Sequence, residues 1–275
     1  MKNNPCIICG GGMQPYIKKE KFVSNLKKVN TKDLLPIIYS CCDECGFLLS
    51  DTHAAMDEHA WVTLNNEFHH ANENDERNEL GFNQPPYLEQ ALMFELLASN
   101  GIIDDKHVLD YAAGYGTLSH LLEKYFQRKI NNYDKYITTI QQNYLSNPSP
   151  KSWSVVINSA MFEHVLTRKD LDSVNDYVAS EGALIIHTVV VEKVPKDPNW
   201  FYIDIPVHTA VHTNRSMSIL MQQWGYQSSI YSPKSKSWAL LKKPYAEIKP
   251  IVDKINGELQ TPFLIAKEGF VDYWK

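Results

Sequence analysis

From about residue 85 onward, apolar residues recur in two alternating patterns. In one pattern they stand three or four positions apart, as Leu88, Leu92 and Leu96 do, which is typical of an amphipathic helix. In the other they form short unbroken runs such as ALIIHTVVV, which are typical of a strand buried on both faces. Together they predict helices over 87–101, 117–126, 136–145, 168–182, 214–225 and 246–260, and strands over 106–114, 129–134, 152–160, 183–192, 227–232 and 237–243. We expect Gly182 to stop the helix over 168–182.

The order of these elements predicts the fold class. Strands that alternate with helices form a doubly wound parallel sheet, so we expect an α/β fold. The last two strands are separated only by residues 233–236, which is too short for a crossover between parallel strands. We therefore expect this terminal pair to form an antiparallel hairpin.

The composition changes along the chain and suggests four segments. Residues 1–50 contain seven lysines and four acidic residues, whereas residues 51–86 contain eight acidic residues and one arginine. We divide the chain into a small module over 1–50, an acidic linker and helical segment over 51–86, the sheet domain over 87–243 and a C-terminal helical extension over 244–275.

All five cysteines lie within the first 45 residues. Four of them form two C-x-x-C pairs, each followed by a glycine that eases a tight turn. An odd number of cysteines in a chain without an export signal argues against disulfides and for metal. We expect a structural zinc ion bound by four thiolates, those of Cys6, Cys9, Cys42 and Cys45.

Two questions about the cysteines stay open at this level. Cys41 is the spare cysteine, and it could replace one of the four ligands. The alternatives to zinc are a set of reduced, unligated thiols or a redox-active pair. Redox chemistry is disfavoured because neither C-x-x-C stands at a strand-to-helix turn of a βαβ unit.

Charge and hydropathy argue against several classes of partner. The net charge of the 275-residue chain is −5, so it has no overall basic field to attract nucleic acid or an anionic membrane. Its apolar runs are far shorter than the ~20 residues that a membrane span needs. The first residues, MKNNPCIIC, lack the apolar core of a signal peptide, so we expect a cytoplasmic protein. The sequence does not indicate an oligomeric state.

Residues 108–118, VLDYAAGYGTL, read as a strand, a glycine turn and the start of a helix. A nicotinamide dinucleotide site requires G-x-G-x-x-G at this place. Gly114 and Gly116 fit that motif, but Ser119 replaces the third glycine. Asp110 at the strand end is also ill suited to a turn that holds pyrophosphate.

The same loop resembles motif I of the Rossmann-like S-adenosylmethionine-dependent methyltransferases, in which an acid precedes three glycines at alternating positions. Here alanine takes the first glycine position. Residues 83–243 as a whole resemble this domain, terminal hairpin included. The resemblance implies a Rossmann-like methyltransferase sheet and S-adenosylmethionine as cofactor. The residues that it places at the cofactor are Tyr87, Asp110, Ala112, Ala113, Gly114, Tyr115, Gly116, Asp134, Asn158, Ser159 and Met161.

One departure from the family lies between Asp134 and Val155, where there is room for one helix and a short connection. The family normally has another strand there, followed by an acidic or polar residue that meets the adenine. The segment NPSPKS offers no such acid. We expect the third strand to be missing or very short.

A cysteine module ahead of such a domain resembles the N-terminal part of deoxysugar C-methyltransferases, which carry a further large C-terminal domain. The resemblance implies methyl transfer to a small metabolite, such as a sugar-nucleotide or natural-product intermediate. One alternative is an RNA-modifying methyltransferase that binds RNA through Lys18, Lys19, Lys27 and Lys28, although the acidic net charge argues against nucleic acid. The other is a non-catalytic, methyltransferase-like binding subunit.

Methyl transfer needs alignment of the acceptor and removal of a proton. Histidine titrates near neutral pH, so histidines near the strand ends are candidate bases. The candidates are His208, His187 and His212; the alternative for each is a packed, hydrogen-bonded histidine.

Other residues carry weaker indications. Glu163 and His164 are adjacent at a helix start, so we expect them not to face each other and to serve a structural or cofactor-capping role. The aromatic stretch 199–206 forms either a lid over the acceptor or a hydrophobic cover. Gln84 and Tyr87 are candidates for contact with the ligand, and ordinary helix packing is the alternative for Tyr87. His69 and His70 are either solvated or near the acceptor.

Overall fold

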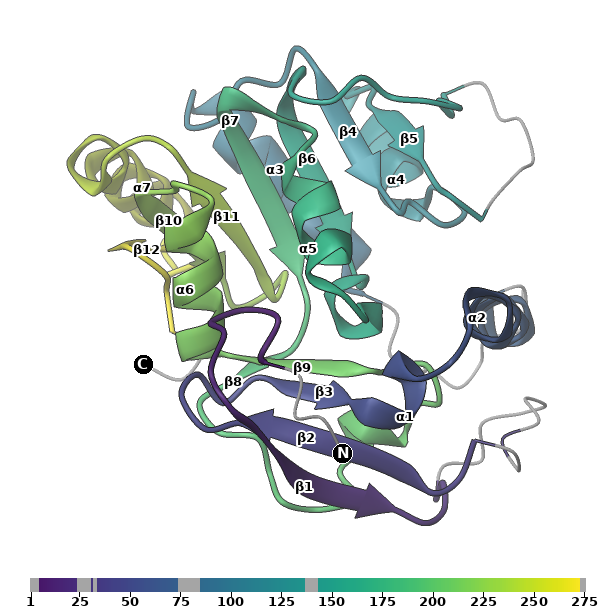
Figure 1. Ribbon diagram of the computed structural model, residues 1–275. Coiled ribbons are helices and arrows are strands. Elements are labelled where there is room, and N and C mark those ends of the chain that lie inside the picture. Colours follow the sequence, from purple (N-terminus) through teal and green to yellow (C-terminus); the bar gives the residue numbers. More distant parts are fainter. Residues whose placement is uncertain (1–4, 24–30, 32–33, 74–84, 137–142, 273–275) are drawn as a thin grey trace.

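The computed structural model describes residues 5–23, 31, 34–73, 85–136 and 143–272 (Figure 1). Over these residues, the strands form two sheets that lie one above the other in the view of Figure 1. The larger sheet has the strand order β12-β10-β11-β7-β6-β4-β5 and the smaller has the order β1-β2-β3-β9-β8. In the part of the chain that is described, no helix is both long and apolar enough to cross a membrane.

The larger sheet confirms the predicted fold class. Four of its strands run parallel, and β11 joins β7 antiparallel, followed by β10 and β12, also antiparallel. The strands β10 and β11 are the expected terminal hairpin. The strand bounds are β4 Val108–Tyr111, β5 Asn131–Tyr133, β6 Trp153–Ser159, β7 Val178–His187, β10 Ser228–Ser232, β11 Ser237–Leu241 and β12 Ile265–Glu268.

Both faces of the larger sheet are covered by helices, as the continuous apolar runs predict. Along β6, Val155 and Ile157 pack into one core, and Val156 between them packs into another, because successive side chains of a strand point to opposite faces. The first core also contains residues of α3 (Tyr87–Ser99), α4 (Thr117–Phe126) and α7 (Tyr245–Leu259). The second also contains residues of α5 (Arg168–Asn175) and α6 (Asn214–Gln223).

The helix predicted over 168–182 is too long. It begins at a capping box between Thr167 and Asp170 and ends at Asn175, and residues 178–182 already belong to β7. We expected Gly182 to stop a helix, but it is a packing glycine instead. A Cβ atom at this position would lie 2.9 Å from the carbonyl oxygen of Trp153 on the neighbouring strand, so a side chain there would push β6 and β7 apart.

The strand predicted over 183–192 is also two strands. The first part is β7 in the larger sheet, which ends at His187, and the second is β8 (Val190–Val191), which pairs parallel with β9 (Ala210–Thr213) in the smaller sheet. A single apolar run therefore leads from one sheet to the other, because both sheets bury it.

The third strand of the family's sheet is reduced to one bridge in the described residues, as we expected. Asn132 of β5 forms a parallel bridge with Tyr144, and its N–H donates to the carbonyl oxygen of Asn143 at 2.8 Å. Most of the helix predicted over 136–145 lies outside the described residues.

The smaller sheet joins the first fifty residues to β9 (Ala210–Thr213), because Leu49 of β3 pairs with Ala210. Strands β1 (Met13–Lys19), β2 (Ile37–Cys42) and β3 (Leu48–Ser50) form an antiparallel meander. Strand β3 then pairs antiparallel with β9. Helices α1 (Asp51–Ala54) and α2 (Glu58–Glu73) follow, and α2 stands beside the space between the two sheets in Figure 1.

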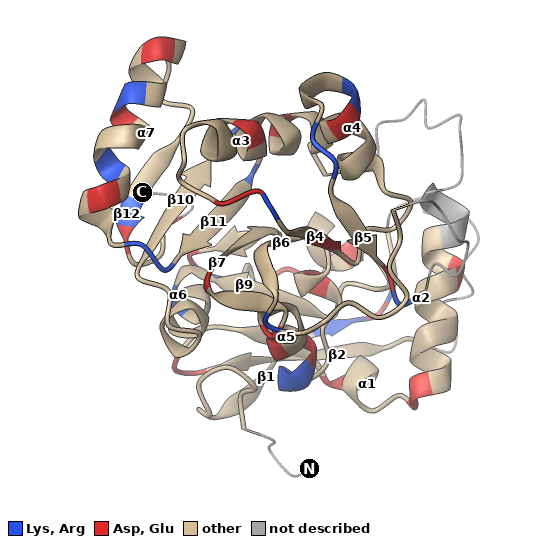
Figure 2. Cartoon of the chain, turned by 90° about the horizontal axis from the view of Figure 1, so that it is seen from above, with Lys and Arg blue, Asp and Glu red and all other residues tan. Residues whose placement is uncertain are grey.

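The outer surface carries charges of both signs. Figure 2 shows basic and acidic residues alternating along α7. There Lys249 pairs with Asp253 and Lys254 with Glu258, each four residues apart. Ion pairs at this spacing lie on one exposed helix face. This face of α7 is therefore mixed in charge.

A buried ion pair ties β1 to the short helix η2 (Phe201–Asp204). The Lys19 side chain is fully buried, and its Nζ donates to Asp204 Oδ1 at 2.6 Å and to the carbonyl oxygen of Pro198 at 2.8 Å. Of the four lysines considered for RNA binding, Lys19 therefore cannot contact phosphate. Lys18 is exposed, and residues 27 and 28 lie outside the described residues.

Replacing Lys19 with methionine removes the cation and leaves Asp204 as an uncompensated buried charge. We expect Lys19→Met to lower the free energy of unfolding by about 3–5 kcal/mol, measured by urea denaturation. Lys18→Met is the matched control, because Lys18 pairs with Glu20 at the surface and its loss should cost less than about 1 kcal/mol. Equal stability of the Lys19 variant and the wild type would contradict this role for the pair.

Candidate functional site

The glycine turn leads directly from β4 into α4. Three alternating residues of the turn, Ala112, Gly114 and Gly116, have positive φ angles of 59°, 54° and 74°. The left-handed region is open to glycine but costs other residues roughly 1–2 kcal/mol. Ala112 thus keeps the backbone conformation of the glycine that motif I places at this position, in spite of its Cβ atom.

Gly116 is restricted by its surroundings as well as by its φ angle. A Cβ atom there would lie 2.8 Å from Asn132 Nδ2 and 3.0 Å from the Tyr144 hydroxyl oxygen. The turn is therefore packed closely against β5 and the bridge that remains of the third strand.

Asp134 holds the turn from the end of the neighbouring strand. Its Oδ2 accepts the N–H of Gly114 at 2.9 Å, and its Oδ1 accepts the N–H of Tyr136 at 2.8 Å. The Tyr144 hydroxyl donates to the Gly114 carbonyl oxygen at 2.7 Å. The two predicted cofactor elements, the turn and Asp134, are thus brought together. Tyr144 was missed because a helix was predicted over 136–145, whereas Tyr144 forms a bridge with Asn132 of β5.

Asp110 lies beneath the turn and is 2% exposed. Burial, together with the negative charge of Asp134, raises the pKa of Asp110 to about 8. The carboxyl group is therefore protonated at neutral pH in the protein alone. A cationic group bound beside it would favour the ionised form and lower this pKa.

The end of β6 adds a small pocket with unsatisfied polar atoms. Asn158 donates from Nδ2 to the Tyr111 carbonyl oxygen at 2.9 Å, and the Ser159 hydroxyl donates to Gln90 Oε1 at 3.1 Å. Asn158 Oδ1 and Gln90 Nε2 are buried and have no hydrogen-bond partner in the protein. The pocket is lined by Gln90, Met93, Phe94, Leu118, Ile157, Asn158, Ser159, Ile185, His187 and Ser237.

Unpaired buried polar atoms are costly, so a water molecule or one small polar group that enters this pocket would be stabilised by hydrogen bonds to them. Gln90 was missed at the sequence level, although a glutamine at a buried position of a helix was the available signal. Among the other predicted cofactor residues, Tyr87 begins α3, Met161 packs at the edge of a core, and Tyr115 is exposed on the turn. Residue 84 lies outside the described residues.

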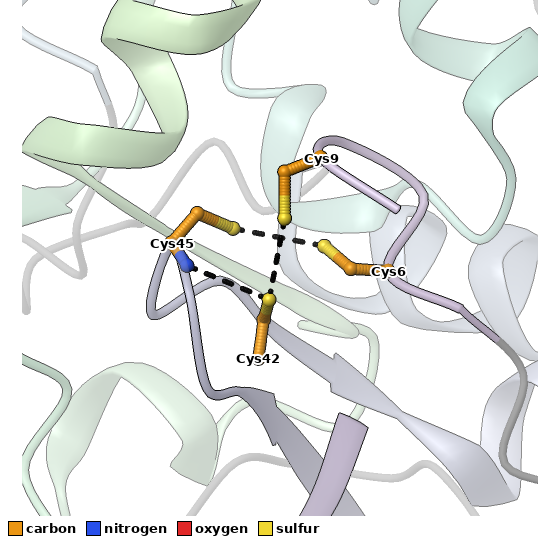
Figure 3. Close-up of side chains that lie close together, drawn as sticks. All are labelled: Cys6, Cys9, Cys42 and Cys45. Atoms are coloured by element: carbon orange, nitrogen blue, oxygen red, sulfur yellow. Dashed lines mark hydrogen bonds between the residues drawn. The ribbon is translucent and has the colours of Figure 1, made fainter. Parts of the chain in front are cut away.

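The four predicted cysteines meet in one cluster (Figure 3). Their sulfur atoms all lie within 4.8 Å of one another, with Cys6 to Cys45 at 3.6 Å and Cys9 to Cys42 at 3.4 Å. A tetrahedral ion with bonds of about 2.3 Å would separate such sulfurs by about 3.8 Å. The cluster therefore has the donor set and the size of a zinc–tetrathiolate site.

Each cysteine pair forms a knuckle in which backbone N–H groups point at sulfur. The N–H of Gly11 lies 3.4 Å from Cys9 Sγ, and the N–H of Cys45 lies 3.5 Å from Cys42 Sγ. Cys41 lies outside the cluster, and its thiol is directed at the carbonyl oxygen of Gly46. Burial raises the pKa of the Cys41 thiol to about 11, so it stays protonated.

The three candidate bases have different surroundings. His187 Nδ1 bonds the Lys236 carbonyl oxygen at 2.8 Å, beside the small pocket. His212 is fully buried between two aromatic rings, those of Phe47 and Phe162, with centroid distances of 5.0 and 5.5 Å. Burial lowers the pKa of each of these two histidines to about 4.

His208 belongs to a different cluster. Its Nδ1 bonds the Tyr202 carbonyl oxygen at 2.7 Å, and burial lowers its pKa to about 3. One donor atom each from Glu163, His164 and His208 lie within 4.8 Å of one another. The expectation that Glu163 and His164 face apart is therefore wrong, because these residues form the tight 3-10 turn η1 (Phe162–His164).

The aromatic stretch 199–206 packs against this cluster. Tyr202 is 4% exposed, and its hydroxyl lies 3.1 Å from the Thr188 hydroxyl, which donates to Glu163 Oε2 at 2.9 Å. The His69 ring lies against that of His164, with a centroid distance of 5.3 Å. Burial raises the pKa of Glu163 to about 7.

Comparison with known proteins gives likenesses of fold at low identity. No family model matches the chain, and no curated protein matches it. A solved protein from Nostoc punctiforme, described as a candidate O-methyltransferase, is 14% identical, with a TM-score of 0.39, over 59% of this chain and 62% of its own length. The plantazolicin methyltransferase BpumL, solved with S-adenosylhomocysteine, is 12% identical, with a TM-score of 0.43, over 67% of this chain and 93% of its own. A methyltransferase from Thermotoga maritima is 13% identical, with a TM-score of 0.40, over 57% of this chain and 91% of its own.

Two substitutions in the turn should change stability in opposite directions. Gly116→Ala adds a strained φ angle and a Cβ overlap with Asn132, so we expect a loss of about 3 kcal/mol in the free energy of unfolding. Ala112→Gly relieves strain but adds freedom to the unfolded chain, so we expect a gain of up to about 1 kcal/mol. Thermal and urea unfolding measure both; a destabilising Ala112→Gly would show that the alanine is not strained.

Proposed function

We propose that the chain transfers a methyl group from S-adenosylmethionine to a small metabolite, for which a sugar-nucleotide or natural-product intermediate is our candidate. The observation that carries this proposal is the pair of acids, Asp110 and Asp134, set around a left-handed turn at the carboxyl ends of two parallel strands. Ligands of open α/β sheets bind at this edge.

The chemistry of the turn favours a cationic ligand over a dinucleotide. S-adenosylmethionine supplies a methyl group on a positively charged sulfonium. A buried Asp110 that is protonated without a nearby cation gains stability in its ionised form when one binds. Pyrophosphate at the same place would be repelled by the Asp134 carboxylate, and it would offer no positive charge to favour ionised Asp110. We assign Asp110, the turn 112–116 and Asp134 to the cofactor, with Asn158 and Ser159 completing the cleft from β6.

For the acceptor, the surroundings favour His208 among the three candidate histidines. The carbonyl oxygen of Tyr202 can only accept, so Nδ1 of His208 carries the proton and Nε2 keeps a lone pair. His212 is enclosed by aromatic rings, and His187 faces the pocket at the end of β7. We propose that His208 contacts the acceptor.

We also propose that the four-cysteine cluster binds one structural zinc ion. The donor set, four thiols in two knuckles, is the one that zinc takes in closed structural sites. Its second support is its position: Thr213 at the end of β9 donates from Oγ1 to the Cys45 carbonyl oxygen at 2.5 Å. The ion would thus fix the N-terminal strands against the rest of the smaller sheet.

Calorimetry with S-adenosylhomocysteine tests the cofactor. We expect wild-type protein to bind it and Asp134→Ala to bind at least about tenfold more weakly, because the variant loses the carboxylate that orders the turn, and tenfold corresponds to about 1.4 kcal/mol. Asp253→Ala, on the exposed face of α7, is the control. Absence of wild-type binding at millimolar ligand, with zinc content intact, would contradict methyl transfer and favour the non-catalytic binding subunit. The hypothesis of a non-catalytic binding subunit is also supported by the third strand, which is reduced to one bridge in the described residues.

Metal analysis and chelation test the zinc. We expect wild type and Cys41→Ser each to hold one more tightly bound zinc ion per chain than Cys9→Ser. A strong chelator should release the ion and lower the thermal stability of the whole chain, because β3 pairs with β9. A chain that holds no metal and unfolds at the same temperature with or without chelator would refute the proposal. Loss of zinc in Cys41→Ser would instead assign a ligand to Cys41.

A further inference from the structure

The cluster around Glu163 stands apart from both the glycine turn and the cysteines. We propose that Glu163, His164 and His208 form a second metal site, for a divalent first-row transition ion. Two imidazoles and one carboxylate suit manganese, iron, cobalt, nickel or zinc better than magnesium or calcium, which prefer oxygen ligands. This inference does not rest on the proposed methyl transfer.

Both histidines are fixed in the orientation that metal ligands adopt. Nδ1 of His164 lies 2.9 Å from the Val207 carbonyl oxygen, and Nδ1 of His208 lies 2.7 Å from the Tyr202 carbonyl oxygen. Because a carbonyl oxygen can only accept, each Nδ1 carries the proton and each Nε2 keeps its lone pair. Metal-binding histidines commonly donate their other N–H to a backbone carbonyl in this way.

Glu163 is oriented by hydroxyl groups on two other segments. The Thr188 hydroxyl, after the end of β7, donates to its Oε2, and the Tyr202 hydroxyl lies against Thr188. Glu163 is 5% exposed, and its own carbonyl oxygen accepts the N–H of Thr209 at 2.7 Å. Both the side chain and the backbone of this residue are thus held in place.

The set as a whole is rich in acceptors. One ring nitrogen of each histidine and one carboxylate oxygen lie within 4.8 Å of one another, and the rings of His69 and His208 both pack against that of His164. A purely hydrogen-bonded cluster needs donors between these groups. A cation satisfies all three at once, which is why buried charges of this kind are commonly paired or coordinate metals.

The three protein ligands would not fill the coordination sphere of the ion. Three protein donors leave at least one coordination position for water or for an oxygen of a bound molecule. Phe162–His164 follows directly after β6, whose last residues line the pocket described above. If the proposed function holds, an acceptor oxygen is the ligand that this position would take. The direct contact between His208 and the acceptor proposed above would then be replaced by a contact through the ion.

Cobalt loading tests the second site. Protein freed of metal and reloaded with cobalt should hold two ions per chain. One, at the cysteines, gives an intense thiolate-to-cobalt charge-transfer band, and the other, with nitrogen and oxygen ligands, gives only weak visible bands. We expect His208→Ala and Glu163→Gln each to hold one ion with the charge-transfer band unchanged. We expect His187→Ala, a control at a half-buried histidine outside the cluster, to hold two. One ion in wild type, or two in both cluster variants, would overturn the proposal.

The readouts distinguish failure of the proposed metal site from misfolding of a variant and from failure of the proposed function. The charge-transfer band reports that the smaller sheet is folded. If His208→Ala loses this band, the variant is misfolded, and the nearly isosteric Glu163→Gln then tests the second metal site in its place. Calorimetry with S-adenosylhomocysteine on the same variants reports the cofactor site independently. Failure of cofactor binding with two ions present would contradict the proposed function and leave the metal site standing.

Discussion

The pairing of β3 with β9 is the contact on which the arrangement of the sites depends. Leu48 pairs with Val211 and Leu49 with Ala210, and the N–H of Ser50 donates to the Thr209 carbonyl oxygen at 2.8 Å. Few hydrogen bonds are involved, but both strands are buried, so the pairing is accompanied by a shared hydrophobic core. It closes one sheet from two segments that are far apart in the sequence.

The larger sheet, in contrast, is built mainly from neighbouring segments, and this explains why the sequence predicted it well. The helix over 117–126 and the terminal hairpin follow from local periodicity and from a four-residue connection. The errors arose where local patterns conflict with packing. Gly182 was interpreted as a helix stop, but the close approach of β6 and β7 requires it. Strand β12 was not expected because its residues are mostly exposed and lack an apolar run.

The candidate sites likewise include some that local sequence patterns predict and some that depend on segments far apart in the sequence. Cysteine spacing identified all four members of the cluster, because a C-x-x-C knuckle is a local structure. The glycine turn was predicted for the same reason, since its conformation depends mainly on the residues of the turn itself. The cluster of Glu163, His164 and His208 could not be predicted, because its third member comes from a loop more than 40 residues later. Tyr144 reaches the glycine turn and Gln90 reaches the end of β6 from segments whose sequence patterns say nothing about the positions of their polar atoms.

Thr209 connects the cysteine cluster to the cluster of Glu163. Its carbonyl oxygen accepts from Ser50 at the end of β3, its N–H donates to the Glu163 carbonyl oxygen, and its hydroxyl donates to the Val165 carbonyl oxygen at 2.7 Å. One residue thus bonds the N-terminal strands on one side and the η1 turn on the other. A metal that fixes the cysteine knuckles would reduce the freedom of β3 and, through Thr209, that of the turn that presents Glu163 and His164. The N-terminal strands therefore do more than precede the sheet domain: they support the place where the acceptor chemistry would occur.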